Sequence, residues 1–580
     1  MTTQKKETAT IDDWVKHSAK GTPEIKVQQR ILEKVNDAQR AQDIAESLRI
    51  DIEVATKVLD ARDAHSPFGF HKFGHFWDLI PLRIREMILH WFQHRLVGHW
   101  DSPIDISELY AEHEAPVHAA LLKNGHVLFI PHGHGFMGMP PTYLWNPEDA
   151  NPATAFYFPE NQPTENLYCS GHAFLSDGRL FTAGGGGAGP AGMNHAWLFN
   201  RDLGTAPDPK GMWTQVQQEM VNARWYPTVL SLGGGRVLIV GGRPDDASAE
   251  MFYENASPPN QFKPVALSNP VDFNQTYPGL HLLPNGQVFN TPTGFGNAGS
   301  SNWTLAMPTD ARLLNVSATT PPSGSWAGLG TGVTMGTVNR VKGMSASLFI
   351  GPIAGSYITK VLVACGSGTN TAEIVDFSSI TPSWTSTLPL PGPGRNNANL
   401  VLLPNGTALL CGGATPTGTA VKECAIYDPF SNAWQPMDTL TYKRAYHSVA
   451  LLLPSGQVMV TGDEDSFSIE IFNPPYLYAG TRPLITTAPD VIHHGQVFEV
   501  ISPQAADDDR VVLVRSMAVT HQTDTEQRVI GMNVSRSGST LTVVAPNGNH
   551  PHPLAPRGYY MLFLVNGQGV PSVGKFVWLH

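Results

Sequence analysis

The chain has 580 residues, of which 41% are hydrophobic, and a formal net charge of −11. This length exceeds one ordinary hydrophobic core, so we expect more than one domain. It contains no block of Lys and Arg and no run of about 18 apolar residues, which argues against nucleic acid as a partner and against a membrane span. The 55 glycines and 47 prolines favour many short strands joined by tight turns.

Residues 1–105 predict a helical N-terminal region that packs on the main body. Thr22 followed by Pro23 is typical of a helix start, and apolar residues then recur at helical spacing. Another helix is expected over residues 82–92, after Pro81. Three histidines lie between these helices: His65, His71 and His75. A packing loop explains them better than a metal site does.

Residues 106–478 contain a strand–turn–strand unit that recurs seven times, with a period of about 50 residues. The units are 118–133, 172–185, 228–242, 280–294, 348–366, 399–413 and 448–462. Six of them have a turn glycine, at Gly125, Gly178, Gly235, Gly286, Gly406 and Gly456. This pattern resembles kelch repeats and predicts a seven-bladed kelch-type β-propeller, whereas a pair of sandwiches would not produce such a period.

Residues 479–580 predict an Ig-like β-sandwich, which completes an all-β fold class. Strands are expected at 495–501, 510–519, 540–544 and 559–565. A polar loop, Thr520–Arg528, directly follows one of these apolar strands and carries His521. This histidine gains a role if the loop reaches into the propeller.

The four cysteines, Cys169, Cys365, Cys411 and Cys424, are too few for a disulfide framework, and they lack the CxxC spacing of zinc sites. Cys411 and Cys424 fall on successive expected strands. A disulfide between them and two buried free thiols are both compatible with this spacing.

The turn glycines place three reactive side chains at one repeated position. Cys169, Tyr226 and His447 each lie nine residues before a turn glycine, and Tyr446 precedes His447. Equivalent positions in different blades meet near the axis of a propeller, so these side chains can form one site. Taken singly, each is more often a core residue; it is the shared register that indicates a chemical site.

With His521 as a fourth donor, this set offers two imidazoles and two phenols, which suits tetragonal Cu(II) better than zinc. A tyrosinate ligand also requires a strong Lewis acid, since a free phenol has a pKa near 10. His132 and His134 form another candidate metal pair, but an HxH pair on a blade loop is more often exposed to solvent.

Cys169, the Arg-Trp-Tyr226-Pro-Thr motif, the Tyr446–His447 pair and Thr-His521 in a C-terminal sandwich together resemble the copper radical oxidases, the galactose oxidase and glyoxal oxidase family. The resemblance covers residues 110–580. It implies a copper ion held by Tyr226, Tyr446, His447 and His521, with Tyr446 as axial ligand and base. It also implies a self-processed radical cofactor, a thioether between Cys169 and Tyr226.

One departure from galactose oxidase bears on the substrate. That enzyme has a tryptophan over the cross-linked tyrosine, and here the corresponding residue is Pro244. The Arg-Trp-Tyr-Pro-Thr motif is closer to that of the glyoxal oxidase branch. The resemblance therefore implies oxidation of glyoxal, methylglyoxal, glycolaldehyde or simple primary alcohols by O2, with H2O2 as product.

The resemblance suggests a secreted or extracellular protein, whereas Met1–Glu7 carries no apolar signal segment. We expect a monomer. The resemblance leaves open whether a peroxidase acts as an activating partner. The rival hypothesis is a kelch-type binding protein that uses loops such as 136–144 for a protein or glycan. A binding protein has no need to keep all five site residues, which favours the enzyme.

Overall fold

The computed structural model describes residues 93–107, 115–132, 140–186, 192–242, 248–255, 257–269, 276–291, 293–294, 311–329, 340–348, 350–353, 356–378, 381–463, 466–506, 509–547 and 555–580. Nearly all of the predicted helical region, with its three histidines, lies outside the described residues. So do His134, Pro244 and residues 136–139 of the loop 136–144. The chain divides into two compact units, Met1–Gln93 and His94–His580, and the second unit is described below.

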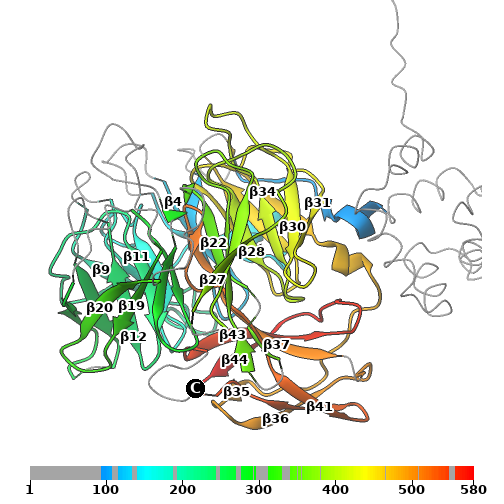
Figure 1. Ribbon diagram of the computed structural model, residues 1–580. Coiled ribbons are helices and arrows are strands. Elements are labelled where there is room, and N and C mark those ends of the chain that lie inside the picture. Colours follow the sequence, from blue (N-terminus) through cyan, green and yellow to red (C-terminus); the bar gives the residue numbers. More distant parts are fainter. Residues whose placement is uncertain are drawn as a thin grey trace, which may run out of the picture. The chain divides into compact units, whose positions relative to one another are not determined.

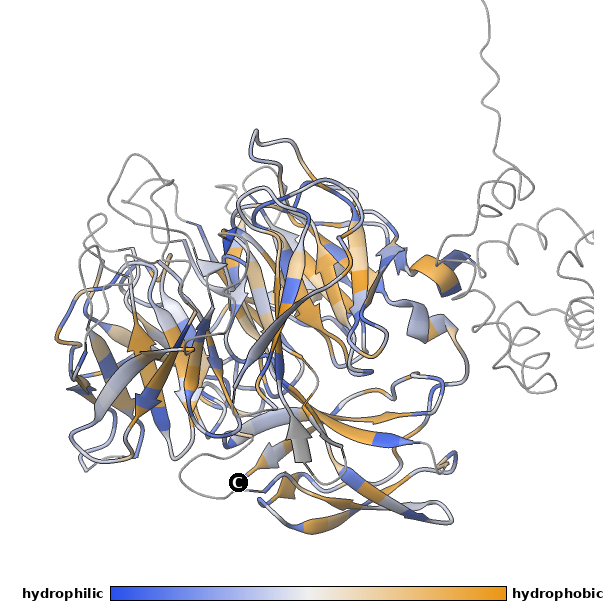
Figure 2. Cartoon of the chain, in the orientation of Figure 1, coloured by the Kyte–Doolittle hydropathy of each residue, from blue (hydrophilic) through white to orange (hydrophobic). Residues whose placement is uncertain are grey.

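The described elements are almost all strands, which confirms the prediction of an all-β chain for this part of the sequence. Short helical segments such as α7 (Pro152–Ala155) and the 3₁₀ helix η3 (Pro475–Tyr478) are exceptions. Within the described ranges, no helix combines the length and apolarity that a membrane crossing needs. Hydrophobic residues concentrate on the strands (Figure 2).

Seven sheets share one antiparallel pattern, in which four strands pair in chain order in the first six sheets and three do so in the last (Figure 1). The first three sheets are β3 (Pro116–Leu121), β4 (Val127–Pro131), β5 (Tyr143–Trp145) and β6 (Phe156–Tyr157); β7 (Gly171–Phe174), β8 (Leu180–Ala183), β9 (Ala196–Asn200) and β10 (Met212–Gln215); and β11 (Thr228–Leu232), β12 (Arg236–Val240), β13 (Ala249–Tyr253) and β14 (Gln261–Pro264). The fourth is β16 (Gly279–Leu282), β17 (Val288–Thr291), β19 (Arg312–Val316) and β20 (Ser323–Gly328), with β15 (Ala266–Leu267) beside β20.

The remaining three sheets continue the series, and the last takes its outer strands from the start of the second unit. They are β22 (Met344–Ser347), β25 (Lys360–Ala364), β26 (Ala372–Asp376) and β27 (Ser383–Ser386); β28 (Asn399–Leu402), β29 (Ala408–Cys411), β30 (Cys424–Asp428) and β31 (Ala433–Met437); and β32 (Ser448–Leu452), β33 (Val458–Gly462) and β34 (Ser468–Asn473), which pairs with β1 (His99–Trp100) and β2 (Ile104–Asp105). Two small ladders stand apart: β18 (Thr293–Gly294) with β21 (Arg340–Val341), and β23 (Gly351–Ile353) with β24 (Ser356–Ile358).

The first strands of the sheets contact one another in sequence order. β7 contacts β11, β11 contacts β16, β16 contacts β22, β22 contacts β28, β28 contacts β32, and β32 contacts β3. Between β3 and β7 lies β38 (Ala518–Thr520), which contacts both. Hydrophobic clusters fill the spaces between neighbouring sheets; in one of them Phe181 of β8 stacks on Phe252 of β13, with ring centroids 4.3 Å apart.

All six predicted turn glycines have φ between 69° and 92° and connect a first strand to a second. Glycine reaches this left-handed region without the clash that a Cβ atom brings. The fifth sheet departs from the expected unit 348–366. Its first strand, β22, precedes that range, and the β23–β24 hairpin is inserted before β25.

Two further sheets form the C-terminal part of the chain (Figure 1). One consists of β35 (Val491–Ile492), β44 (Lys575–Leu579), β43 (Gly558–Val565), β37 (Arg510–Arg515) and β40 (Val529–Gly531), and the other of β36 (Val497–Ile501), β42 (Thr540–Val544) and β41 (Asn533–Ser537). Leu513, Leu541 and Leu562 belong to one buried cluster shared by the two sheets. The expected strand 510–519 is interrupted after Arg515, and its remainder, β38, leaves for the innermost edge of the first sheet.

Candidate metal centre

Six residues that lie one or two positions before a first strand adopt the same unusual backbone conformation. They are Cys169 (φ 63°), Tyr226 (63°), Tyr277 (47°), Lys342 (60°), Asn397 (56°) and His447 (69°). A positive φ is uncommon for residues other than glycine. Its recurrence at one position of successive sheets shows that Cys169, Tyr226 and His447 are equivalent in the repeat.

Main-chain hydrogen bonds connect several of these positions. The Tyr226 N–H donates to the Cys169 carbonyl at 3.0 Å, and the Tyr277 N–H donates to the Tyr226 carbonyl at 2.8 Å. The Asn397 N–H donates to the Lys342 carbonyl at 2.9 Å. The backbone at one sheet therefore fixes the backbone at the next.

The phenols of Tyr226 and Tyr446 meet, with their Oη atoms 2.6 Å apart. Cys169, Tyr226 and Tyr277 form a small buried cluster, against which Tyr168, Trp225 and Tyr446 pack. Cys169 is inaccessible to solvent and Tyr226 is 2% exposed, whereas Tyr446 is half-buried. Of the two phenols, Tyr446 is thus the one that a molecule from solvent can reach.

Two imidazoles complete the set. The rings of His447 and His521 lie 4.7 Å apart at 85°, and the His521 ring lies 4.8 Å from that of Tyr226. Tyr168 places its Oη 3.0 Å from His447 Nε2. All five site residues predicted from the sequence are therefore brought together.

His521 owes its position to a tight hairpin of β38 and β39 (Thr523–Asp524). β38 pairs with β3, so that Thr520 faces His118. The two turn residues, His521 and Gln522, have φ of 47° and 64°, as in the type I′ turns that usually contain Asn and Gly. Thr520 Oγ1 lies 2.7 Å from His521 Nδ1, which orients the ring.

Gln522 connects this hairpin to the segment that carries Tyr446 and His447. Its Nε2 donates to the carbonyls of Ala445 and Ser448, both at 2.8 Å. Its Oε1 accepts from Asn397 Nδ2 at 3.2 Å. One buried amide thus fixes the position of His521 relative to that of His447.

Burial at the site favours the uncharged forms of the tyrosine and histidine side chains. Burial, reinforced by the Cys169 thiol and the Tyr446 phenol, raises the pKa of Tyr226 well above its usual range. Burial, together with the neighbouring histidines, lowers the pKa of His521 well below its usual range. A phenolate at Tyr226 therefore requires a Lewis acid, while His521 is neutral and ready to donate a lone pair.

The residues fit a metal of defined character. Among the described residues, no group of three His, Cys, Asp or Glu side chains could hold an ion. Two nitrogens and two oxygens are available from neighbouring side chains, those of His447, His521, Tyr226 and Tyr446. This donor set suits Cu(II).

The sequence prediction missed several neighbours of the site. Tyr277 lies nine residues before Gly286, so the rule that identified Cys169 would have found it. Its ring stands 4.7 Å from Tyr226 at 77°. Trp225, beside Tyr226 in the sequence, has its ring 4.4 Å away at 52°. His132, considered as half of an HxH pair, lies 5.3 Å from His447 by ring centroids.

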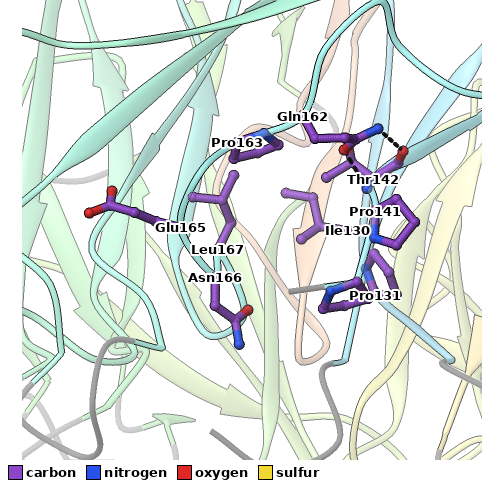
Figure 3. A pocket seen from close by; sticks show the side chains of 10 residues that line it. Ile130, Pro131, Pro141, Thr142, Gln162, Pro163, Glu165, Asn166 and Leu167 are labelled. Carbon is purple, nitrogen blue, oxygen red and sulfur yellow. Dashed lines mark hydrogen bonds between the residues drawn. The ribbon is translucent and has the colours of Figure 1, made fainter. Parts of the chain in front are cut away.

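A cavity of about 70 Å³ opens near the site, without any of the four donors in its wall (Figure 3). Its lining includes Pro131, Pro141, Gln162, Glu165 and Asn166. Asn166 connects this cavity to the site, since its Oδ1 accepts from the Tyr168 N–H at 3.0 Å. The cavity borders the site but cannot itself be the metal position.

Two family models match the chain. Residues 161–476 match the model described as "Glyoxal oxidase N-terminus", and residues 482–579 match "Galactose oxidase-like, Early set domain". A fungal alcohol oxidase of the AA5 family, solved in complex with copper, superposes with a TM-score of 0.65 and 22% identity over 83% of this chain and 99% of its own. At this identity the likeness concerns the fold alone.

Curated relatives agree with the family models. The chain is 28% identical to "Aldehyde oxidase GLOX" of Vitis pseudoreticulata, over 71% of this chain and 82% of the relative. It is 27% identical to "Aldehyde oxidase GLOX1" of Arabidopsis thaliana, over 71% of each. Galactose oxidase of Gibberella zeae is 30% identical, over 30% of this chain and 28% of its own. Since the first model spans more than half of its residues, the chain belongs to the glyoxal oxidase family and is an oxidoreductase of the glyoxal and galactose oxidase type.

Proposed function

We propose that this protein is a copper radical oxidase that oxidises small aldehydes or simple primary alcohols with O2 and releases H2O2. The observation that carries the proposal is the contact of Tyr226 with Tyr446, at 2.6 Å between phenol oxygens, beside His447, His521 and the buried Cys169 thiol. Glyoxal, methylglyoxal and glycolaldehyde are the expected aldehydes.

The proposed architecture is a seven-bladed kelch-type propeller at residues 106–478, followed by an Ig-like sandwich at 479–580 and preceded by a helical region. The expected end of that region, at residue 105, is corrected by β1 and β2, since residues 99–105 pair with β34 of the last propeller sheet. The contacts between first strands support the propeller, because β38 occupies the one remaining gap between β3 and β7. The buried cluster shared by the two C-terminal sheets supports the sandwich. The sandwich would then donate His521 to the centre of the propeller.

In this proposal Tyr226, Tyr446, His447 and His521 hold the copper ion. When bound, copper would supply a site for the substrate oxygen and a route for electrons to O2. Tyr446, half-buried and hydrogen-bonded to Tyr226, takes the proton of the substrate hydroxyl. The Tyr226 ring, joined to Cys169 by a thioether, holds an oxidising equivalent and takes a hydrogen atom from the substrate carbon.

Overall, an alcohol gives its aldehyde while O2 becomes H2O2, and an aldehyde plus water gives the acid with the same product. Two aromatic neighbours, the buried Tyr277 and the half-buried Trp225, pack against the Tyr226 ring. A ring enclosed in this way is shielded from water, which favours a long-lived oxidised state. Trp225 could thus provide shielding that Pro244 cannot.

The test is an H2O2 assay on copper-loaded protein with glyoxal, methylglyoxal, glycolaldehyde, simple primary alcohols and galactose, accompanied by metal analysis. One copper per chain and a preference for the small aldehydes or alcohols are expected. A ranking with galactose first would disprove the substrate assignment. If no copper bound and no H2O2 formed with any substrate, a binding protein would be the better interpretation.

A further inference from the structure

The backbone at Cys169 is held differently from that at three of its repeat equivalents. At Tyr226, Tyr277 and Asn397, the N–H donates to the carbonyl of a left-handed residue in the preceding sheet. Cys169 belongs to the second sheet, and between residues 115 and 132 the structure shows no left-handed residue other than glycine. The kind of acceptor that serves Tyr226, Tyr277 and Asn397 is therefore missing here.

The side chain of His118 takes over this role. The Cys169 N–H donates to His118 Nε2 at 3.2 Å, across 51 positions of sequence, and both residues are buried. An imidazole nitrogen that accepts a hydrogen bond carries no proton, so the ring proton of His118 must be on Nδ1. The ring acts as a fixed acceptor.

His118 also adjoins the hairpin that carries His521. In the β3–β38 ladder His118 faces Thr520, the residue that contacts the His521 ring. His118 thus links the backbone of Cys169 to the strand that leads to His521, a proposed copper ligand. Pairing with β38 also limits the freedom of β3, so that His118 Nε2 is presented in a single place.

We propose that His118 is a positioning residue that holds Cys169 in its left-handed conformation and thereby sets the rate of thioether formation with Tyr226. This inference rests on the proposed function. Without the acceptor, the Cys169 N–H would be buried and unsatisfied, and the residue would relax toward a more ordinary φ. Such a relaxation moves Cβ and takes the thiol away from the Tyr226 ring.

The covalent step itself involves other atoms. The Cys169 S–H and one ring C–H of Tyr226 are lost, a carbon–sulfur bond forms, and two electrons and two protons pass to O2, giving H2O2. His118 neither accepts these protons nor changes its redox state. Its contribution is the geometry of the reacting thiol.

The experiment follows the loss of two hydrogens by intact mass after apo protein is exposed to copper and O2. His118→Gln retains an acceptor, Oε1, at about the reach of Nε2, whereas His118→Leu removes it. We expect the thioether to form about tenfold more slowly in His118→Leu, as for the loss of one buried hydrogen bond, and close to the wild-type rate in His118→Gln.

His172→Leu is the matched control. The His172 imidazole is also buried, at 4% exposed, and its ring lies 5.2 Å from that of His118. Among the described residues, no hydrogen bond joins it to Cys169. Thioether formation should keep the wild-type rate in this variant. Equal rates in His118→Leu and His172→Leu would overturn the proposal.

A further comparison does not depend on whether His118→Leu folds. His118→Asn preserves polarity, but its amide is one methylene too short to reach the Cys169 N–H, so it should process slowly while His118→Gln processes normally. Equal rates in these two variants would also refute the positioning role. Failure of the proposed function would instead show in the wild type, as absence of copper binding or of any mass loss, and would overturn both.

Discussion

At the scale of single residues, the site is marked by backbone strain. A left-handed conformation costs about 1–2 kcal/mol for residues other than glycine, yet Cys169, Tyr226, His447 and His521 all adopt it. Such conformations persist only where the surrounding structure enforces them, and they cluster at functional sites. The strain directs a thiol, a phenol and two imidazoles toward one another instead of into the sheets.

The first prediction concerns the Cys169 thiol. Cys169→Ser should abolish the loss of two hydrogens on copper treatment, while copper content stays near the wild-type value, because Cys169 is not a proposed ligand. Turnover should fall by about a hundredfold or more, equivalent to about 3 kcal/mol of transition-state stabilisation, since an unsubstituted phenol is harder to oxidise.

Intact mass, metal analysis and an H2O2 assay measure these three properties. Cys365→Ser, at another fully buried cysteine, is the control and should retain the mass loss. Near-normal turnover in Cys169→Ser would exclude the cross-linked radical, even if the copper site remained.

At the scale of elements, the β38–β39 hairpin is the feature that brings His521 to the site. The sequence pattern correctly predicted a polar loop with a lone histidine after an apolar strand. It could not show that β38 would leave its own sheet to pair with β3, because that ladder joins residues about 400 positions apart. Nor could it assign Gln522, whose partners near β28 and β32 are 74 to 125 residues away.

Gln522→Met should separate the two halves of the site. The variant removes the amide donor of the Ala445 and Ser448 carbonyls. The Ala445 carbonyl still accepts from the Ser448 N–H and hydroxyl, so the expected cost is about 1–3 kcal/mol in total. The Tm of the variant should fall and its copper affinity should drop, because the segment that carries His447 is no longer fixed to the hairpin. Calorimetric copper titration and thermal melts measure both effects.

Gln527→Met is the control for that comparison. Gln527 is equally buried, but it binds the main chain of Leu400 and Leu402 within β28. Its loss should lower the Tm and leave copper affinity unchanged. Equal copper affinity in the two variants would show that Gln522 does no more than stabilise the fold.

Asp524, in β39, predicts a pH dependence of stability. Burial raises its pKa to about 8, and its Oδ1 accepts from the N–H of Glu526 at 2.7 Å. The pKa of Asp524 in the folded protein lies above its unfolded value near 3.8. Protonated Asp524 therefore contributes fully to the free energy of unfolding below the unfolded pKa. This contribution decreases as pH rises toward 8, by up to about 1.4 kcal/mol per pH unit.

Asp524→Asn keeps an acceptor oxygen and cannot ionise. Relative to wild type, its Tm should therefore rise steadily from pH 5 to pH 8 in parallel thermal melts. Asp208→Asn removes a charge from an 85% exposed side chain and should show no such trend. Parallel curves for Asp524→Asn and the wild type would contradict a carboxyl that is protonated in the fold.

At the scale of the whole molecule, the repeat could be predicted because each unit carries a turn glycine between two apolar strands. All six of these glycines have the expected conformation. The fifth unit was misplaced because the β23–β24 hairpin interrupts the spacing on which the register depends. Cys411 and Cys424, left open from sequence, are free buried thiols on the adjoining strands β29 and β30.

The start of the second unit closes the last sheet. β1 and β2 pair with β34, and Trp100, 5% exposed, packs on Phe472 with ring centroids 4.9 Å apart. The Trp100 Nε1–H also donates to the Asp438 carbonyl at 3.0 Å. Residues 99–105, which the sequence prediction grouped with the helical region, thus contribute to the sheet that begins just after His447.

This arrangement predicts different outcomes for two shortened chains. A chain that begins at residue 94 keeps β1, β2 and every proposed ligand, so it should bind copper, form the thioether and oxidise substrate as the full chain does. A chain that begins at residue 107 loses Trp100 and exposes the edge of β34. Removal of a buried tryptophan alone costs about 3 kcal/mol or more, and an open strand edge favours aggregation. Its Tm and soluble yield should therefore fall sharply.

Thermal melts, gel filtration and metal analysis of both chains test these expectations. Loss of copper from the chain that begins at 94 would mean that the site depends on residues 1–93. An unchanged Tm in the chain that begins at 107 would mean that β1 and β2 do not stabilise the last sheet.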